Sequence, residues 1–369
     1  MRIVISGGGT AGHVNPAIAT ALELRARGCE VVYIGTPDGP ESRLVPEQDI
    51  PFVPLEAAGF RRRHPLTLVT SSLKVLESSR RARRMFDARR PDAVVGFGGY
   101  VSLPVGMAAQ RMHLPLVIHE QNSVPGLTNR SLGRHADRVA VTYELSRTYF
   151  DDVDSWRVVV TGNPVRRSVL EGDRARGRRL LGVPDDALLL VVMGGSLGAR
   201  HLNEALVALR DELMAVDGLY VVQSTGPRNF DEVSAALGSG CGERWKLYPY
   251  LEQMGDDLAA CDCIVSRAGA SSLAEITAVG LPSLLVPYPY ATDDHQTKNA
   301  RDLAREGACF MVADSEVEGR QFSDALMRLL KDGELRASMA NAAARFGRPD
   351  AARRLADLVI EAIEGHDRP

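Results

Sequence analysis

The stretch Arg2-Ile3-Val4-Ile5-Ser6-Gly7-Gly8-Gly9-Thr10-Ala11-Gly12-His13 decides the fold, because an apolar strand runs directly into a glycine-rich turn. The pattern returns in the second half, where Leu188–Met193 leads into Gly194-Gly195-Ser196-Leu197-Gly198-Ala199-Arg200. A strand that ends in glycines and opens a helix presents unpaired backbone N–H groups and a positive dipole end to an anion. Two such units predict two nucleotide-type domains.

Short Val- and Ile-rich segments alternate with helical patterns along the whole chain, which is typical of parallel sheets covered on both faces. Strands are expected near residues 2–6, 30–35, 92–97, 115–119, 137–142 and 157–161, then 187–193, 219–224, 246–249, 263–266, 283–286 and 309–312. The first helix is expected from about residue 15, with Pro16 in its first turn, and the residues after 166 read as a polar, Arg-rich stretch.

The 369 residues suit two domains of roughly 150–200 residues each. We therefore predict an α/β protein of two doubly wound, Rossmann-like domains with a ligand crevice at the carboxyl ends of their strands. The boundaries are expected to give an N-terminal domain (1–163), a C-terminal domain (164–345) and a last helix (346–369) that packs back on the first domain.

Composition narrows the class of protein. The net charge is −3, the five cysteines are scattered, and the start of the chain lacks the apolar region of a signal peptide. No apolar run reaches the roughly 20 residues that span a bilayer. We expect a protein of the reducing cytoplasm with no disulfides, no metal site, no cofactor and no nucleic-acid partner.

His13 is the first candidate catalytic residue, because the glycines leave its ring at the carboxyl end of a strand and the nearby helix dipole disfavours imidazolium. A neutral ring there can take a proton. His119-Glu120-Gln121-Asn122 follows another strand and is placed to line the same crevice. Glu120 is the alternative base, or it orients one.

The glycine turn Gly96-Phe97-Gly98-Gly99-Tyr100 opens a helix and allows close approach of an acceptor, although a tight turn explains it equally well. Asn129 lies one helical turn into a later element and is expected to point the same way. We therefore assign acceptor binding to Gly98, Gly99, Tyr100 and Asn129.

In the second half, Ser196 and Gly195 are expected to cradle a diphosphate, with Arg166 adding positive charge. Glu275 follows a turn of small residues and can accept both hydroxyls of a ribose, unless it only complements the helix dipole. Gln296 and Asn299 share a helix face and can read sugar hydroxyls.

Basic and apolar residues interleave between residues 60 and 90, which indicates an interfacial membrane site unless the helix is simply core-packed with a solvated basic face. The proposed patch consists of Arg61, Leu68, Leu73, Lys74, Leu76, Arg80 and Arg84.

Together these loops resemble the MurG family of bacterial N-acetylglucosaminyltransferases, from Gly7 to about Ala308. The most particular motifs are His119-Glu120-Gln121-Asn122 and Gly162-Asn163-Pro164-Val165-Arg166. The resemblance implies a GT-B fold with the acceptor on the first domain and UDP-GlcNAc on the second. It also implies inverting transfer of GlcNAc to the C4 hydroxyl of MurNAc in lipid I, forming lipid II at the cytoplasmic face of an anionic membrane, near other cell-wall synthesis proteins.

By the same resemblance, His13 is the candidate base, Arg166 and Ser196 contact the diphosphate, Glu275 the ribose, and Gln296 with Asn299 the GlcNAc. Further donor contacts are expected at Thr10, Gly12, Asn122, Gly195, Leu251 and Ala270, with Leu251 near the uracil. Position 197 is Leu where some family members have Gln. The rival interpretations are another GT-B transferase, a UDP-GlcNAc 2-epimerase and a non-catalytic nucleotide-sugar-binding protein; metal dependence stays open.

Overall fold

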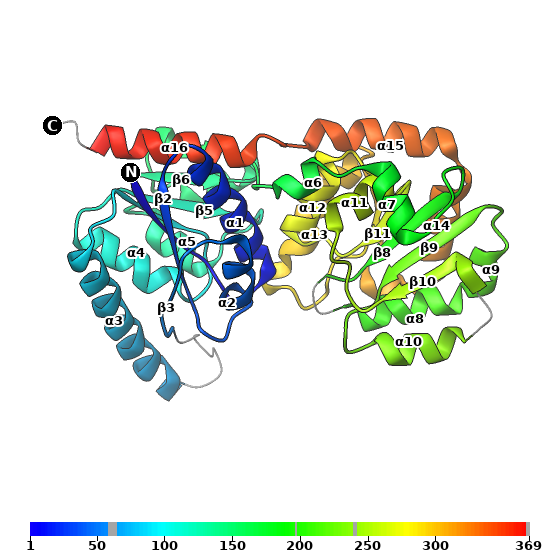
Figure 1. Cartoon of the computed structure of the whole chain (residues 1–369), viewed down its shortest axis with the longest axis horizontal. Helices are drawn as coiled ribbons and strands as arrows, with labels where there is room; N and C mark the ends of the chain where they lie inside the picture. The colour runs from blue at the N-terminus through cyan, green and yellow to red at the C-terminus, as the bar shows by residue number, and fades with distance from the viewer. Residues whose placement is uncertain (58–64, 196–197, 239–241, 367–369) are drawn as a thin grey trace. The chain divides into compact units, whose positions relative to one another are not determined.

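The computed structural model describes residues 1–57, 65–195, 198–238 and 242–366, and describes side chains of the helix after residue 64 only from residue 73. The chain divides into two compact units, one of residues 1–165 with 349–369 and one of residues 166–348 (Figure 1). The first boundary lies two residues after the predicted one, and the second lies three residues after it. Each unit is an α/β layer structure, which confirms the predicted fold class.

The sheet of the first unit is entirely parallel in the described residues, with strand order β3-β2-β1-β4-β5-β6-β7. Its strands are β1 (Arg2–Ser6), β2 (Glu30–Gly35), β3 (Phe52–Pro54), β4 (Ala93–Gly96), β5 (Leu116–Glu120), β6 (Arg138–Val141) and β7 (Val158–Val160). The order reverses between β1 and β4. The loops after these two strands therefore lie at a topological switch point, where ligands bind in open α/β sheets.

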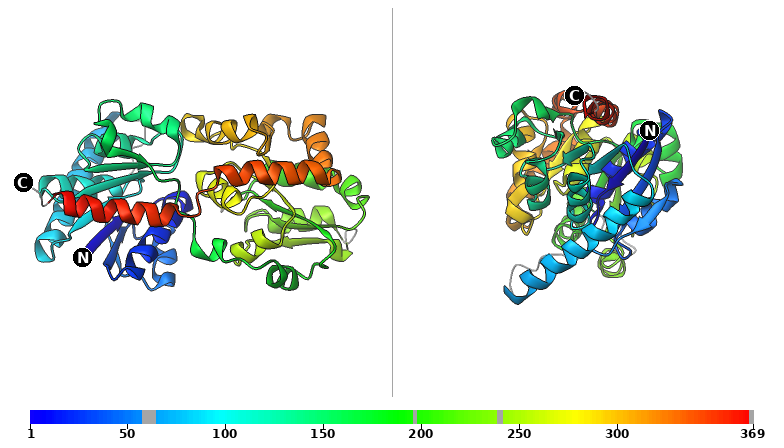
Figure 2. Two further views of the ribbon diagram at one scale, coloured as in Figure 1. Left: turned by 90° about the horizontal axis from the view of Figure 1, so that it is seen from above. Right: turned by 90° about the vertical axis from the view of Figure 1, so that its left-hand side faces the viewer.

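Helices cover both faces of this sheet. They are α1 (Ala11–Ala26), α2 (Glu41–Leu44), α3 (Pro65–Ala88), α4 (Ser102–Arg111), α5 (Leu127–Gly133) and α16 (Ala351–His366). On one face, α1 and α16 bury residues such as Ala17 and Val359 against the strands, and Figure 2 shows α16 (red) lying across that face. On the other face, α3, α4 and α5 bury Phe86, Val105 and Leu132.

The second unit repeats the scheme with strand order β10-β9-β8-β11-β12-β13, again all parallel in the described residues. Its strands are β8 (Leu188–Met193), β9 (Leu219–Ser224), β10 (Trp245–Tyr248), β11 (Cys263–Ser266), β12 (Ser283–Leu285) and β13 (Phe310–Met311). The order reverses between β8 and β11, so the loops after them form the second switch point.

Ten helices in the described residues surround this second sheet: α6 (Arg167–Leu170), α7 (Arg174–Leu181), α8 (Arg200–Ala208), α9 (Arg210–Met214), α10 (Phe230–Leu237), α11 (Met254–Ala260), α12 (Ala270–Ala278), α13 (His295–Arg305), α14 (Arg320–Lys331) and α15 (Gly333–Phe346). One face is buried by α8, α9, α10, α14 and α15 through residues such as Leu202, Phe322 and Met339. On the other face α11 packs on α7 and β8.

Several predicted elements are corrected by the structure. The first helix begins at Ala11, so Pro16 lies in its second turn and not its first. The sequence pattern predicts one helix over residues 202–215, but the structure divides this segment into α8 and α9 at Leu209. The Arg-rich stretch after residue 166 contains α6 and α7, and β3 was not predicted.

Candidate active site

His13 lies in the first turn of α1, directly after the loop that follows β1. Its Nδ1 atom lies 3.1 Å from the Gly8 carbonyl oxygen and 3.1 Å from Thr10 Oγ1. A carbonyl oxygen only accepts hydrogen bonds, so Nδ1 carries the proton and Nε2 carries the lone pair. A Cβ atom placed on Gly98 would lie 3.3 Å from Nε2. The ring is thus held in the tautomer that a general base needs, beside the glycine turn that follows β4.

Glu120 ends β5 and is 2% exposed. Its Oε1 accepts from the Asn122 backbone N–H at 2.9 Å, and its Oε2 accepts from the Gly126 N–H at 3.1 Å and Asn129 Nδ2 at 2.8 Å. Burial raises the pKa of Glu120, and these hydrogen bonds oppose the rise. With a further bond from Asn122 Nδ2 to Oε1, the carboxylate accepts four hydrogen bonds and organises the loop, which favours a positioning role for Glu120 over proton transfer.

The remaining polar residues of this motif do not all line a crevice. His119 is fully buried, and its Nε2 donates to the Gly162 carbonyl at 3.0 Å. Burial lowers the pKa of His119 to about 4, so the ring is neutral. Gln121 is 1% exposed and donates to the Phe97 carbonyl at 3.0 Å. The expectation that all four side chains face a ligand is therefore wrong for His119 and Gln121.

The candidate acceptor residues lie in and around the glycine turn that follows β4, Gly96-Phe97-Gly98-Gly99-Tyr100. Gly98 and Gly99 have φ of +90° and +79°, where other residues are strained. A Cβ on Gly99 would lie 2.3 Å from the Gly8 carbonyl oxygen, so the first loop itself requires glycine there. Asn129 is 2% exposed and donates to the His119 carbonyl, whereas Tyr100 is 53% exposed. Of these residues, Tyr100 offers the most surface to a ligand.

The candidate donor loop of the second unit follows β8. Gly195 has φ of +85°, and among the described residues no atom lies within 4 Å of an added Cβ. A Cβ on Gly194 would lie 2.4 Å from the Ala199 N atom, so the backbone before α8 leaves room only for glycine at this position. Ser196 and Leu197 lie outside the described residues. The backbone geometry of Gly195 suits a diphosphate cradle.

Arg166 and Glu275 are paired with each other. Arg166 Nε and Nη2 lie 2.9 Å and 2.8 Å from Glu275 Oε1. The Glu275 side chain is 7% exposed and that of Arg166 is 26% exposed. Burial raises the pKa of Glu275, and the positive charge of Arg166 opposes the rise. Sequence reasoning assigned these residues to separate parts of a ligand; the structure brings them to one point.

Gln296 joins two loops of the second unit. Its Oε1 accepts from the Ala268 N–H at 3.1 Å and the Tyr288 N–H at 2.9 Å. Asn299, one turn later, is 1% exposed. While these bonds persist, Gln296 offers a ligand its amide nitrogen. Asn299 lies on the same face of α13 but is buried.

The remaining candidate donor positions differ in how much side chain they present. Leu251 and Ala270 are buried, which leaves their backbone groups for a ligand. Thr10 is exposed at the start of α1, and Gly12 is the helix's second residue. Asn122 donates both its backbone N–H and its Nδ2 to Glu120 Oε1.

Metal-ligating side chains do not converge in the part of the chain that the structure describes. Asp293 and Asp294 both have positive φ, and Asp294 Oδ1 accepts from Thr297 Oγ1 at 2.6 Å. Asp294 occupies the N-cap position of α13, but its side chain accepts no capping hydrogen bond from a backbone N–H of that helix. Cys261 and Cys263 are buried thiols whose pKa values burial raises.

Arg267 and Glu41 are buried charged residues beside the candidate loops that sequence reasoning missed. Arg267 is 7% exposed, donates to the Val286 carbonyl at 3.2 Å and pairs with Asp314 at 2.5 Å. It thereby ties the loop after β11 to the loop after β12. Glu41 is fully buried beneath the first glycine loop. The only signal for either was a charge beside small residues, which is not specific.

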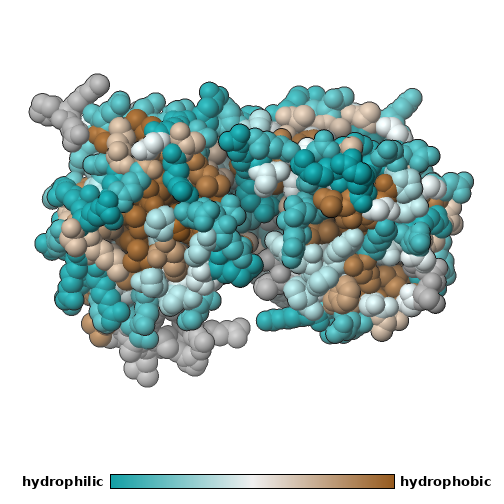
Figure 3. Space-filling model, viewed as in Figure 1, coloured by the Kyte–Doolittle hydropathy of each residue, from teal (hydrophilic) through white to brown (hydrophobic). Residues whose placement is uncertain are grey.

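The basic and apolar helix α3 carries the predicted membrane patch. Leu73 and Leu76 are 62% and 37% exposed, and Lys74, Arg80 and Arg84 are exposed. Hydrophilic and hydrophobic residues both lie over α3 in the space-filling view (Figure 3). Arg61 and the side chain of Leu68 lie outside the described residues. Of the helices that the structure describes, none is long and apolar enough to cross a membrane.

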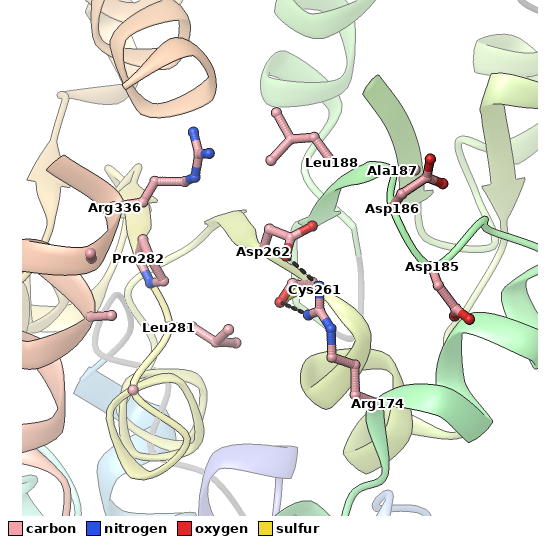
Figure 4. Close-up of a pocket in the computed structure, with 13 residues that line it drawn as sticks. Arg174, Asp185, Asp186, Ala187, Leu188, Cys261, Asp262, Leu281, Pro282 and Arg336 are labelled. Carbon is pink, nitrogen blue, oxygen red and sulfur yellow. Dashed lines mark hydrogen bonds and ion pairs between the residues drawn. The ribbon is translucent and has the colours of Figure 1, made fainter. Parts of the chain in front are cut away.

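A cavity of about 540 Å³ opens at the other edge of the second sheet, before β8, β11 and β12 (Figure 4). Arg174 Nη2 lies 2.6 Å from Asp262 Oδ1, and Arg336 donates to the carbonyls of Leu329 and Leu330. Both arginines are thus satisfied by the protein. The cavity lies at the amino ends of the strands, away from the switch point, and contains none of the candidate site residues.

Comparison with known proteins connects both halves to one family. The chain matches the glycosyltransferase family 28 N-terminal domain over residues 3–141 and the family 28 C-terminal domain over residues 189–355. A crystal structure of MurG from Acinetobacter baumannii is 30% identical, covers 98% of this chain and 99% of its own, and superposes with a TM-score of 0.75. A UDP-GlcNAc 2-epimerase from Neisseria meningitidis, at 14% identity and a TM-score of 0.70, shares the fold alone.

Curated relatives match over nearly the whole length. A protein of Halalkalibacterium halodurans is 41% identical over 98% of this chain and 99% of its own, and one of Bacillus subtilis is 38% identical over 98% and 99%. Both are named UDP-N-acetylglucosamine--N-acetylmuramyl-(pentapeptide) pyrophosphoryl-undecaprenol N-acetylglucosamine transferase. This chain belongs to that glycosyltransferase family, the MurG branch of family 28.

Proposed function

We propose that this chain transfers GlcNAc from UDP-GlcNAc to the C4 hydroxyl of MurNAc in lipid I, with inversion at the anomeric carbon, to form lipid II. The observation that carries the chemistry is the bond from His13 Nδ1–H to the Gly8 carbonyl, which leaves the lone pair on Nε2. The family match supplies the substrates, since the relatives' names specify both donor and acceptor.

The reaction needs a base, an aligned alcohol and a stabilised leaving group. His13 Nε2 takes the proton of the attacking hydroxyl as the new C1–O bond forms. The bond from C1 to the phosphate oxygen breaks, and UDP leaves with its electron pair. Backbone N–H groups at Gly195 and at the start of α8 stabilise the departing charge, together with Arg166.

Donor recognition uses the second unit in this proposal. Glu275 accepts hydrogen bonds from the ribose hydroxyls, and backbone groups at Leu251 and Ala270 contact the nucleoside. Gln296 and Asn299 contact GlcNAc. Arg166, which pairs with Glu275, supplies positive charge for the diphosphate. Acceptor binding uses Gly98, Gly99, Tyr100 and Asn129. The family resemblance assigns Thr10, Gly12 and Asn122 to donor binding.

The acceptor in this proposal carries an undecaprenyl chain, so the enzyme must work at a membrane surface. We assign that contact to the α3 patch, where the exposed Leu73 and Leu76 stand among Lys74, Arg80 and Arg84. Basic residues near an anionic surface each contribute about 1 kcal/mol. The protein then acts as a peripheral protein on the cytoplasmic face, near other cell-wall synthesis proteins.

The test is release of UDP from UDP-GlcNAc, with and without a soluble lipid I analogue, in the presence of EDTA. We expect release that depends on the acceptor, with a disaccharide product detected by mass spectrometry. Tight UDP-GlcNAc binding without release would assign another acceptor. Conversion of UDP-GlcNAc into an epimer without any acceptor would replace the transferase proposal by the epimerase alternative.

A further inference from the structure

Glu41 is a fully buried carboxylate that lies beneath the first glycine loop. It begins α2, just after β2. Its Oε2 accepts from the Gly9 N–H at 3.2 Å, and its Oε1 accepts from the Thr36 N–H at 2.9 Å and Thr36 Oγ1 at 2.6 Å. The charge is therefore held by three donors from two loops.

Glycines make room for this carboxylate. A Cβ on Gly8 would lie 2.2 Å from Glu41 Oε1, and one on Gly39 would lie 2.4 Å from both oxygens. A Cβ on Gly35 would lie 2.6 Å from Glu41 Cγ. Real Cβ atoms do not approach that closely, so these glycine positions accommodate the carboxylate.

One peptide group connects Glu41 to the base. The Gly8 carbonyl and the Gly9 N–H belong to the same planar peptide. Glu41 accepts from that N–H, and His13 Nδ1–H donates to that carbonyl at 3.1 Å. An anion on the N–H polarises the peptide and makes its carbonyl oxygen a better acceptor. Gly99, packed over the Gly8 carbonyl, restricts the peptide from another side.

We propose that Glu41 is a positioning residue for His13, acting through the Gly8–Gly9 peptide to hold the Nδ1–H tautomer and the ring orientation. The arrangement resembles the carboxylate that orients a catalytic histidine, with a peptide group placed between the two. The inference rests on the proposed function, because it takes His13 as the base. It also means that the Gly9 N–H serves Glu41 and not a bound anion.

The first test is the state of the His13 ring, measured by ¹⁵N NMR on histidine-labelled protein without substrates. The His13 signals are assigned by their loss in His13→Ala. We expect a single Nδ1–H tautomer in the native protein and a mixture of tautomers in Glu41→Gln. An unchanged His13 spectrum in Glu41→Gln would overturn the proposal. This readout needs no transfer activity, so it stands apart from the test of the proposed function.

The second test is steady-state transfer. We expect Glu41→Gln to lower kcat roughly ten- to hundredfold, within the usual contribution of a positioned base, with the Kd for UDP-GlcNAc unchanged. Glu47→Gln is the matched control, because Glu47 lies in the same segment but is exposed and pairs with the exposed Arg43. In a His13→Ala background, Glu41→Gln should lower kcat no further.

An equal loss in both backgrounds would show that Glu41 acts on the fold in general, and would contradict the proposal. Glu41→Asp provides a second variant in case the glutamine protein does not fold, because it keeps the charge but withdraws the carboxylate from the Gly9 N–H. It should also lower kcat and alter the pH profile of kcat/KM. A pH profile and kcat like those of the native protein would overturn the inference.

Discussion

The Arg166–Glu275 pair allows a prediction whose size follows from the structure. Replacing Arg166 by methionine leaves the Glu275 carboxylate, 7% exposed, without its counter-charge. Removing one partner of a fully buried pair costs about 3–5 kcal/mol. Because Arg166 is a quarter exposed, water screens part of the interaction, and we expect a loss of about 2 kcal/mol in the free energy of unfolding at pH 7.

The pH dependence of this loss has a definite sign. Burial already raises the pKa of Glu275, and Arg166 opposes that rise, so the variant raises the pKa further. When a carboxyl group has a higher pKa in the folded than in the unfolded state, its contribution to the free energy of unfolding is lost as pH rises through the folded pKa. The stability difference between Arg166→Met and the native protein should therefore be smaller at pH 5 than at pH 7.5.

The two tryptophans make the measurement specific. Trp245 is 5% exposed in the second unit, and its Nε1 donates to Gln223 Oε1 at 3.0 Å. With Trp156 replaced by phenylalanine, urea unfolding followed by fluorescence reports on residues 166–348 alone. Arg167→Met is the matched control, since Arg167 is exposed and pairs with Glu171 at i,i+4; it should cost less than about 0.5 kcal/mol.

Equal losses for the Arg166 and Arg167 variants at both pH values would refute the reasoning, because the buried pair would then contribute no more than an exposed one.

Three further predictions concern the first unit. Gly99→Ala places a Cβ 2.3 Å from a backbone oxygen at φ +79°, so it should lower the free energy of unfolding by at least about 2 kcal/mol in urea titrations and abolish transfer; native stability would contradict the packing. Because burial lowers the pKa of His119 to about 4, the free energy of unfolding of the native protein should fall by about 3 kcal/mol as pH falls from 6.5 to 4. His119→Asn should make the free energy of unfolding depend less on pH in this range, and parallel pH curves for the two proteins would contradict the prediction. Replacing Leu73 and Leu76 by aspartate should weaken binding to phosphatidylglycerol vesicles at least about tenfold in sedimentation assays, whereas Leu180→Asp in the second unit should not; equal effects would remove α3 as the membrane contact.

The strands and their glycine turns were predictable because both signals are local. Apolar runs such as Leu188–Met193 followed by glycines are typical of buried parallel strands, and the glycines mark the switch points. Strand β3 was not predictable, because two half-buried residues followed by the exposed Pro54 carry no alternating pattern. Helix α7 was missed because its Arg178, 1% exposed, finds its partner Asp262 only in the folded unit.

The candidate site shows the same limit. The sequence pointed to His13 because a histidine follows glycines at the end of a strand, and the structure adds the bond that sets its tautomer. The sequence indicated Glu120 because a carboxylate can act as a base. The groups that donate hydrogen bonds to this carboxylate come from segments whose folding no local pattern predicts. Pairs such as Arg166 with Glu275 lie 109 residues apart and depend on the whole unit.

The most direct test of the central claim compares His13→Ala and Glu120→Gln in single-turnover transfer to a soluble lipid I analogue, with the Kd for UDP-GlcNAc measured on the same samples. We predict that His13→Ala slows transfer by about 10²–10⁴-fold while donor binding stays within about twofold, because His13 moves the proton and does not hold the donor. Transfer at the native rate by His13→Ala, with a loss of that size confined to Glu120→Gln, would contradict the account and make Glu120 the base.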